Sequence, residues 1–388
     1  MDKNFAKVGQ IKDRLIQSLN EVISFDNCAF LNYPNYGNIG DHLIGLGTIL
    51  YLIDEANTDI SYVASLHNFS ASEMEKKIGK SPILLQGGGN LGDLWYEHQK
   101  FREYIISNYH DNPIIILPQT IYFKNQGCLK EARKKFNSHP NLTIFVRDCY
   151  SLQIAQDNFP DCQLILAPDM AFQLSGMILR DSINVKRNQQ NKSYLYFKRK
   201  DKELNPLFTP ERLNLNNIHI EDWIAYKDKW LLEDVVEEYI SREYKIELSS
   251  LTSLSVRSLV KIYREIWQRM LKTPREYIHR RKWLKSSPIR QRLESYYRSY
   301  MYQLSLSLSY SGSYQLSQYD LVITTRLHGH ILCTLLGIPN IFLPNSYHKN
   351  LGFYEAWTAD IPFSRFLKNE DRIETLIAEL KTVSPRER

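Results

Sequence analysis

Residues 321–336, LVITTRLHGHILCTLL, indicate how the second half of this chain folds. The apolar run Leu321–Ile323 predicts a buried strand, and Ile331, Leu332, Leu335 and Leu336 recur at helical spacing. The segment between them, TTRLHGH, is therefore expected to form the turn from strand to helix. A unit of strand, turn and helix is typical of a parallel sheet that carries helices on its faces.

The same alternation extends over most of the chain. Helical spacing occurs at 4–22 and near 41–53, 94–109, 128–137 and 148–157, among strand-like runs at 28–33, 60–64, 82–86, 113–117, 142–146 and 163–166. A second, less regular series has strands near 194–197, 218–220, 321–324 and 340–343, with helices near 327–337 and 350–358. We therefore expect an α/β fold in which two Rossmann-like, doubly wound domains face each other across a cleft.

The domains are expected to cover residues 1–180 and 190–388, with the boundary in the polar segment 180–192. The second domain carries a charge-rich stretch at about 230–300, which its composition predicts to be a helical insertion. Ligands of such folds bind at the carboxyl ends of the strands, so the residues that follow each strand are the candidates for a site.

The composition is that of a globular protein. Of the 388 residues 43% are hydrophobic and 24% charged, which excludes a disordered chain, and 16 Gly with 15 Pro exclude a collagen-like one. No apolar run approaches the roughly 18 residues that span a bilayer, and no signal-peptide core is visible, so we expect a cytoplasmic protein. The five widely spaced cysteines fit neither a disulfide framework nor a zinc site, and no His/Asp cluster has metal-binding spacing.

Polar residues follow several strands of the first domain. Asn38 and Asp41 follow the first strand, Asn90 follows three consecutive glycines at 87–89, and Gln119 follows the run at 113–117. Because glycines cost backbone entropy, we expect another group to approach the backbone at 87–89. Asp41 either caps a helix or accepts a proton or hydrogen bond from a hydroxyl, and Gln119 either contacts sugar-like hydroxyls or is an ordinary loop residue.

Charged residues follow the remaining strands. Arg147 and Asp169 place charges at the ends of two further strands of the first domain. In the second domain, Arg326 lies beside the N–H groups that begin a helix, which together would bind an anion. Histidine is the residue type that most often serves as a general acid, so His328 would donate a proton beside that anion, and Arg199 would supply a second guanidinium from a neighbouring strand end.

With these strand-end residues identified, the chain resembles the polysaccharide pyruvyl transferase family, especially its bacterial exopolysaccharide branch, from about residue 28 to 358. The matching segments are NYGNIGDHLI, QGGGNLGDLW, ILPQTIYF, VRD, PDMAF, FKRKDKE and TTRLHGHI followed by LLGIPNIFLPNSYHKNLGFYEAW. Thr325 stands where family members often have Asp or Ser, and the basic stretch 257–298 looks like an enlarged insertion.

The resemblance implies a fold similar to GT-B glycosyltransferases, with the acceptor on the side of 1–180 and the donor on the side of 190–388. It implies transfer of pyruvate from phosphoenolpyruvate to a sugar diol of an exopolysaccharide or lipid-linked glycan, as a cyclic ketal. In the family the arginine and histidine of the RLHG block and the arginine of an RxDxE-like block serve phosphoenolpyruvate, which here are Arg326, His328 and Arg199. Phosphoenolpyruvate is a co-substrate, and we expect no cofactor and no metal.

Ketal formation requires an acid for the methylene carbon of the donor and a base for the sugar hydroxyl. We expect His328 to be the catalytic acid and Asp41 the catalytic base, facing it from the opposite domain. Lys349 is expected to assist the phosphate. The full set of expected substrate-binding residues is Arg199, Arg326, Arg147, Lys349, Asn90, Gln119, Asn38 and Asp169.

Two other functions stay open on the sequence. A metal-free GT-B glycosyltransferase that uses a nucleotide sugar would need a base-binding pocket, which no motif identifies. A non-catalytic glycan-binding protein of an export complex would have no use for Arg199, Arg326 and His328 together. Phosphate release from phosphoenolpyruvate that depends on a glycan acceptor would distinguish these functions.

The positive charge is local. The chain carries a net charge of +6, but residues 257–298 contain thirteen Lys and Arg against three Glu, so the rest of the chain is net negative. A nucleic-acid partner for the whole protein is therefore not expected. The segment also contains aromatic residues, which suits peripheral contact with an anionic membrane, RNA binding, or simply a solvated helical face.

We predict that the protein floats with liposomes that contain anionic lipid, because each Lys or Arg near such a surface contributes about 1 kcal/mol. Liposome flotation with and without anionic lipid, at low and high salt, measures this. If no salt-sensitive flotation is seen, residues 257–298 have no membrane role.

Overall fold

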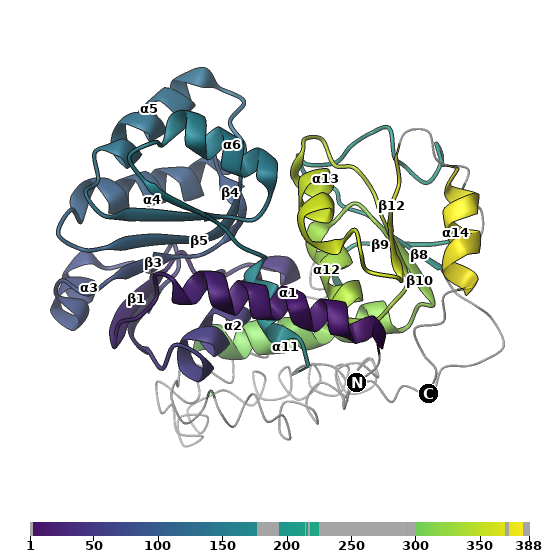
Figure 1. Ribbon diagram of the computed structural model, residues 1–388, viewed down its shortest axis with the longest axis horizontal. Helices are drawn as coiled ribbons and strands as arrows, with labels where there is room; N and C mark the ends of the chain where they lie inside the picture. The colour runs from purple at the N-terminus through teal and green to yellow at the C-terminus, as the bar shows by residue number, and fades with distance from the viewer. Residues whose placement is uncertain are drawn as a thin grey trace, which may run out of the picture.

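The computed structural model describes residues 3–176, 194–213, 215, 218–224, 293, 300–368 and 372–382. Within these ranges the chain forms two parallel β-sheets, one in each half of the sequence (Figure 1). The expected α/β fold with two Rossmann-like units is therefore confirmed. The expected boundary at 180–192 and almost all of the expected insertion at about 230–300 lie outside the described residues.

The first sheet is doubly wound. Its strands lie in the order β2 (Asp59–Ala64), β1 (Asn27–Leu31), β3 (Ile83–Leu85), β5 (Ile114–Ile121), β6 (Leu142–Val146) and β7 (Gln163–Leu166), and β4 (Gly88–Leu91) pairs with β5. All the pairs are parallel, and the direction of winding reverses between β1 and β3. The carboxyl ends of these two strands are therefore the switch point at which such sheets bind ligands.

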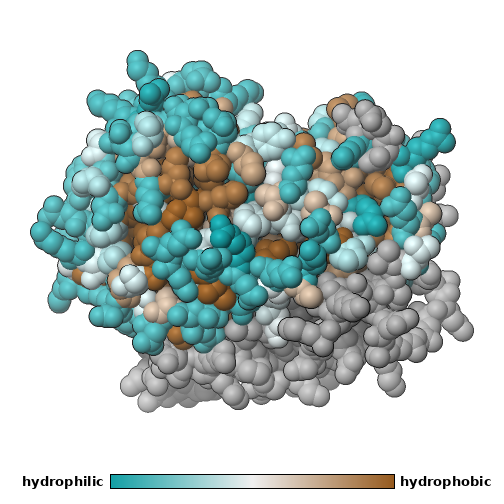
Figure 2. All heavy atoms as spheres, viewed as in Figure 1, coloured by the Kyte–Doolittle hydropathy of each residue, from teal (hydrophilic) through white to brown (hydrophobic). Residues whose placement is uncertain are grey.

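Helices cover both faces of this sheet. Neighbouring residues of a strand point to opposite faces of the sheet. Accordingly, Phe30 and Leu31 of β1 belong to two different buried apolar clusters. One cluster includes α1 (Lys3–Asn20) and α2 (Ile39–Asp54), and the other includes α3 (Ala71–Ile78), α4 (Tyr96–Asn108), α5 (Gln126–Asn137) and α6 (Cys149–Asn158). On the face seen in Figure 2 the surface is mostly hydrophilic, and hydrophobic side chains gather over the first sheet, above α1.

The second sheet is smaller and is built in the same way. Its parallel strands lie in the order β12 (Ser364–Phe366), β11 (Asn340–Phe342), β10 (Leu321–Thr324), β8 (Tyr194–Phe197) and β9 (His219–Glu221). The helices of this half include α12 (Leu327–Leu336), α13 (Lys349–Phe353), a π-helical turn at Tyr354–Thr358 and α14 (Ile373–Thr382). Winding reverses between β8 and β10, so a second switch point lies at the ends of these strands.

One apolar cluster joins the two halves. It contains side chains of α1, α2, α12 and both sheets, together with α11 (Tyr300–Ser317), which packs against α2. Figure 1 shows α1 and α11 extending from the first half toward the second along the lower side of the molecule. The two sheets are therefore held in a fixed relation by a continuous core rather than by a linker alone.

The sequence-predicted strands agree with the structure within a few residues, but local details differ. Asn38 is the N-cap of α2, where its Oδ1 accepts from the Gly40 backbone N–H at 3.3 Å, so Asp41 lies in the first turn and is not the cap. Strand β5 continues to Ile121, which places Gln119 inside the strand rather than in the loop after it. Strands β4 and β12 and helices α3, α11 and α14 were not predicted.

The close packing of α2 generates a stability prediction. A Cβ at Gly47 would lie 2.2 Å from the backbone oxygen of Met170, in the short helix Met170–Leu174, so Gly47→Ala forces these elements apart. We expect its free energy of unfolding to fall by about 1–3 kcal/mol. Thermal and urea denaturation measure the change.

The matched control is Gly9→Ala, in the middle of α1, where a Cβ would meet nothing within 4 Å. Because alanine is the better helix former, this variant should be stabilised by about 0.5–1 kcal/mol. Changes of the same sign and size in both variants would contradict this account of the α2 packing.

Candidate functional site

A pocket of about 260 Å³ lies between the carboxyl ends of the two sheets. The first half contributes residues from the loops after β1 and β3, and the second half contributes residues from the loops after β8, β9, β10 and β11. Both switch points therefore open into one space. Its walls are formed by Tyr36, Asn38, Asp41, Gly89, Asn90, Trp95, His98, Arg199, Asp201, Glu203, Trp223, Arg326, Leu327, His328 and Lys349.

Most of the sequence-predicted site residues are brought together here. The pocket is lined by Asn38, Asp41, Asn90, Arg199, Arg326, His328 and Lys349. The other three, Arg147, Gln119 and Asp169, are fully buried and are not among the lining residues. They contact residues of the pocket wall instead of the pocket itself.

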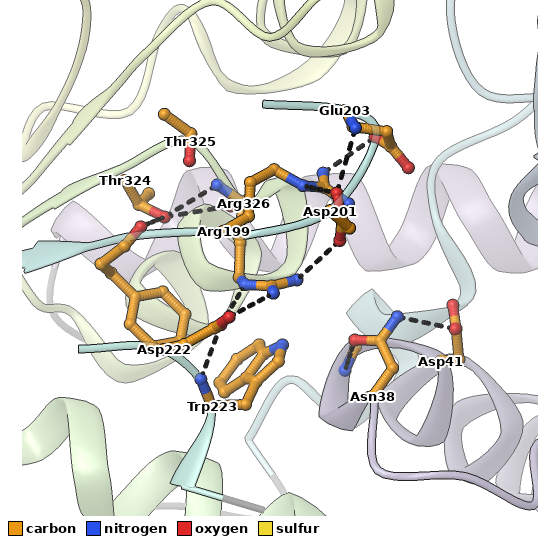
Figure 3. Close-up of polar contacts among 12 residues, drawn as sticks. Asn38, Asp41, Arg199, Asp201, Glu203, Asp222, Trp223, Thr324, Thr325 and Arg326 are labelled. Atoms are coloured by element: carbon orange, nitrogen blue, oxygen red, sulfur yellow. Dashed lines mark hydrogen bonds and ion pairs between the residues drawn. The ribbon is translucent and has the colours of Figure 1, made fainter. Parts of the chain in front are cut away.

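The two arginines point into the same region and are paired with carboxylates (Figure 3). Arg326 donates from Nε and Nη2 to the two carboxylate oxygens of Asp222, at 2.6 and 2.9 Å. Arg199 donates to Asp201 at 2.7 Å and to Glu203 at 2.8 Å, and Asp201 also lies 3.9 Å from Nη1 of Arg326. The two arginines expected to bind an anion are therefore part of a network of alternating charges.

Lys349 extends this network. Its Nζ donates to Oε2 of Glu203 at 2.8 Å, the same oxygen that accepts from Arg199. Burial raises the pKa of Glu203, but the charges of Lys349 and Arg199 outweigh burial and hold the pKa well below its usual range. Burial lowers the pKa of Lys349, with Glu203 opposing the change.

The glycine triplet at 87–89 is approached by protein groups, as expected. A Cβ at Gly87 would lie 2.6 Å from the backbone oxygen of Pro118 in β5, and one at Gly89 would lie 2.7 Å from Nζ of Lys349. Gly88 has a φ of 128°, which side chains rarely adopt. These positions allow the lysine of the second half to reach the backbone of the first.

His328 lies at the junction of the halves, in the first turn of α12. Its Nε2 is 3.3 Å from Oδ2 of Asp169, which also accepts a short hydrogen bond from Nη1 of Arg147. The ring also packs against the start of α2, because a Cβ at Gly40 would lie 2.4 Å from Nδ1 of His328. This contact places the imidazole beside Gly40, the residue that directly precedes Asp41 in the sequence.

Asp41 is held at the pocket by its own loop. Its Oδ2 accepts from Nδ2 of Asn38 at 2.7 Å and from the hydroxyl of Tyr36 at 2.9 Å. Behind this loop, buried His42 bonds to the Tyr36 backbone oxygen and to the Ser305 hydroxyl of α11. Burial lowers the pKa of His42 to about 4, so it is neutral near pH 7 and acts as a structural group.

Asn90 is oriented by two buried side chains. Its Oδ1 accepts from Nη2 of Arg102 at 2.8 Å and from Nε2 of Gln119 at 3.1 Å. With the oxygen occupied, the Nδ2 group is left to donate to a bound molecule. Arg102 is completely buried, and burial lowers its pKa to about 10.

Several residues of this site escaped sequence analysis. Asp201 and Glu203 alternate with Arg199 in the quoted FKRKDKE segment, and that alternation was the available signal. Asp222 carries no motif and reaches Arg326 only because β9 lies beside β8. The aromatic residues of the pocket, whose rings suit the faces of sugars, were also missed: Tyr36, Trp95, His98 and Trp223.

Two negative findings apply to the described residues alone. Among them, no three His, Cys, Asp or Glu residues form a group that could hold a metal ion. No helix in those same ranges has both the length and the apolar character needed to cross a membrane.

Known proteins similar to this chain include two named pyruvyl transferases. The chain is 28% identical over 381 residues to "Putative pyruvyl transferase EpsO" of Bacillus subtilis, covering 98% of this chain and all of that protein. It is 24% identical over 338 residues to "Pyruvyl transferase 1" of Schizosaccharomyces pombe, covering 85% of this chain and 69% of that one. These matches extend through both halves of the fold.

A solved structure supports the fold. A functionally uncharacterised protein of Klebsiella pneumoniae superposes with a TM-score of 0.52 at 19% identity, covering 92% of this chain and 98% of that one. The model of the polysaccharide pyruvyl transferase family matches residues 38–347, from the N-cap of α2 to the loop before α13. Since that match covers well over half of the sequence and includes most of the residues that line the pocket, the chain belongs to the polysaccharide pyruvyl transferase family.

Proposed function

We propose that this protein transfers pyruvate from phosphoenolpyruvate to two hydroxyls of a sugar in an exopolysaccharide or lipid-linked glycan, forming a cyclic ketal. The observation that carries the proposal is the single pocket in which Arg199, Arg326, His328 and Lys349 of the second half face Asp41 of the first. Family membership supports the class of reaction.

The donor fits the second half of the site. Phosphoenolpyruvate carries a carboxylate and a phosphate, and arginine binds both groups through paired N–H donors. Because Arg199 and Arg326 are already paired with carboxylates, a bound donor competes with Asp201, Asp222 and Glu203 for the same cations. Lys349, whose ammonium is held at Glu203, supplies a further positive charge for the phosphate.

The acid and base lie on opposite halves. His328 donates a proton to the methylene carbon of the donor, and Asp41 accepts the proton of the attacking sugar hydroxyl. The second hydroxyl then displaces phosphate from the same carbon and closes the ring, and its proton leaves with the phosphate. The contact of His328 with Gly40 supports these roles, because it places the acid beside the helix turn that carries the base.

The acceptor fits the first half of the site. Asn38 and Asn90 supply polar groups, and Trp95, His98 and Tyr36 supply aromatic surface against which a sugar ring stacks. Gln119 would act indirectly, by holding Asn90. A lipid-linked acceptor would agree with peripheral membrane contact through the basic segment 257–298, which lies, apart from Leu293, outside the described residues.

The test is incubation of the purified protein with phosphoenolpyruvate and lipid-linked glycan, followed by mass spectrometry of the glycan and measurement of phosphate. We expect a glycan with an added pyruvyl group and one phosphate released per group. Phosphate release without any change in the glycan, or sugar transfer from a nucleotide sugar, would reject the proposal.

Replacing Arg326 by lysine should weaken donor binding. Lysine keeps the charge but loses the paired donors of guanidinium, so we expect KM for phosphoenolpyruvate to rise by about 10- to 100-fold. Steady-state kinetics measure it. The control is Arg365→Lys, whose side chain pairs with Glu379 at the surface and should leave KM unchanged; equal KM in both variants would count against a donor-binding role for Arg326.

Replacing His328 by alanine should abolish turnover and leave the protein folded. General acid catalysis contributes about 10²–10⁴-fold, so kcat is expected to fall by at least that factor. Turnover and circular dichroism are compared with His110→Ala, which alters an exposed histidine of the first half. Near-normal turnover in the His328 variant would remove this residue as the acid.

A further inference from the structure

A buried set of hydrogen bonds lies behind His328, on the side away from the pocket. Arg147, at the end of β6, donates through Nη1 to Oδ2 of Asp169, and the same oxygen lies 3.3 Å from Nε2 of His328. Arg147 and Asp169 have no exposed surface, and neither lines the pocket, whereas His328 does. Their geometry therefore suits a role that is exerted through the imidazole and not through contact with substrate.

Asp169 is held rigidly. Its Oδ1 accepts from the backbone N–H of Ala171 at 2.9 Å, which makes it the N-cap of the short helix Met170–Leu174. Arg147 is fixed in turn, because its Nε donates to Oγ1 of Thr120 in β5 at 2.9 Å. Burial raises the pKa of Asp169, but the charges of His328 and Arg147 outweigh it and hold the pKa well below its usual range. The carboxylate is thus ionised and able to accept.

An ionised carboxylate next to Nε2 determines how the imidazole carries its protons. The carboxylate can only accept, so Nε2 must bear a hydrogen in order to bond to it. The other ring nitrogen, Nδ1, lies toward α2, 2.4 Å from the position of a Cβ at Gly40. Because Nε2 is held by Asp169, which does not line the pocket, Nδ1 is the nitrogen left to serve a bound substrate.

We propose that Asp169, held by Arg147, is a positioning residue that fixes His328 with Nε2–H bonded to it, so that Nδ1 delivers the catalytic proton. The inference rests on the function proposed above. It replaces the direct substrate contact that the sequence suggested for Asp169 and Arg147.

The proton balance is simple. In the charged imidazole, the Nδ1–H bond breaks as a C–H bond forms at the methylene carbon of phosphoenolpyruvate, using the electron pair of the C=C bond. The carbon that carries phosphate becomes electron-deficient and is attacked by the sugar hydroxyl. His328 is left neutral with its remaining proton on Nε2, still bonded to Asp169.

The arrangement also makes the acid depend on both halves of the chain. Asp169 and Arg147 follow strands of the first sheet, whereas His328 follows β10 of the second. The imidazole is oriented only when the two sheets keep the relation seen here. No equivalent partner from the second half reaches Nε2 among the hydrogen bonds of the described residues.

The test is Asp169→Asn, which keeps the size of the side chain and an oxygen for the Ala171 N–H. We expect kcat to fall by about 10²–10⁴-fold, the range of a misplaced general acid, with KM for phosphoenolpyruvate within about threefold of the original. A rise in KM without loss of kcat would overturn the proposal, because it would make Asp169 a donor-binding residue.

A double-mutant cycle separates this role from a merely structural one. In a His328→Gln background, Asp169→Asn should lower kcat no further, since its effect acts through the imidazole. If the substitution lowers kcat by the same factor in both backgrounds, Asp169 does not act through His328.

The matched control is Asn112→Asp, the reverse isosteric exchange at another buried position of the first half. Asn112 donates from Nδ2 to the backbone oxygens of Gly79 and Ser81, and none of these residues lines the pocket. Its kcat should stay close to that of the unaltered protein at temperatures where both variants are folded. An equal loss in both variants would assign the effect to general loosening and reject the proposal.

A measurement on the unaltered protein covers the case in which Asp169→Asn does not fold. With ¹⁵N-labelled histidine, the NMR signals that disappear in His328→Gln should show neutral His328 protonated at Nε2, and protonation at Nδ1 would overturn the proposal. This readout needs no turnover. If it shows Nε2–H while the glycan gains no pyruvyl group, the proposed function fails and the positioning of His328 stands.

Discussion

The structure depends on one constraint, which is that the carboxyl ends of two parallel sheets must face each other at a fixed separation. Each sheet alone places a handful of polar residues at its switch point, and neither set is a complete site. The apolar cluster that contains α1, α2, α11 and α12 fixes the separation, because it packs side chains of both sheets into one core. The pocket follows from that packing, and so does the proximity of the proposed acid to the proposed base.

The charge distribution of the pocket follows from burial. Cations such as Arg199, Arg326 and Lys349 are nearly inaccessible to water, and a buried charge needs a partner. Asp201, Glu203 and Asp222 provide those partners, so these cations are paired within the protein itself. The same carboxylates set a threshold for binding, since an incoming anion gains only the difference between its own contacts and those it replaces.

Much of the fold could be predicted from the sequence, because strands buried on both faces are continuous apolar runs and the helices between them have clear spacing. Helix α11 is the main element that the sequence pattern did not predict. In it, Leu304, Leu306 and Leu308 alternate with serines. A period of two is typical of a strand, yet the segment is helical and its serines are buried, with Ser311 and Ser313 each donating to the carbonyl four residues earlier. Packing against α2, which no local pattern shows, decides this helix.

For the site, the residues that directly follow strands were predictable, since the topology brings strand ends together. Seven of the sequence-predicted residues line the pocket. What could not be predicted are pairings across large sequence separations, such as Asp222 with Arg326 and Asp169 with His328. Each pairing depends on which strands are neighbours and on how the two sheets dock, and the roles of these residues remain predictions.

The orientation of Asn90 has an evolutionary consequence. Its side-chain carbonyl oxygen accepts from buried Arg102 and buried Gln119. A change at position 90 alone would therefore leave the buried guanidinium of Arg102 without its shortest hydrogen bond. Under the proposed function, drift toward new acceptor sugars at this wall would therefore require concerted exchange at 90, 102 and 119. Among homologues these three positions should covary, and swapping them as a block is the natural route to altered sugar selectivity.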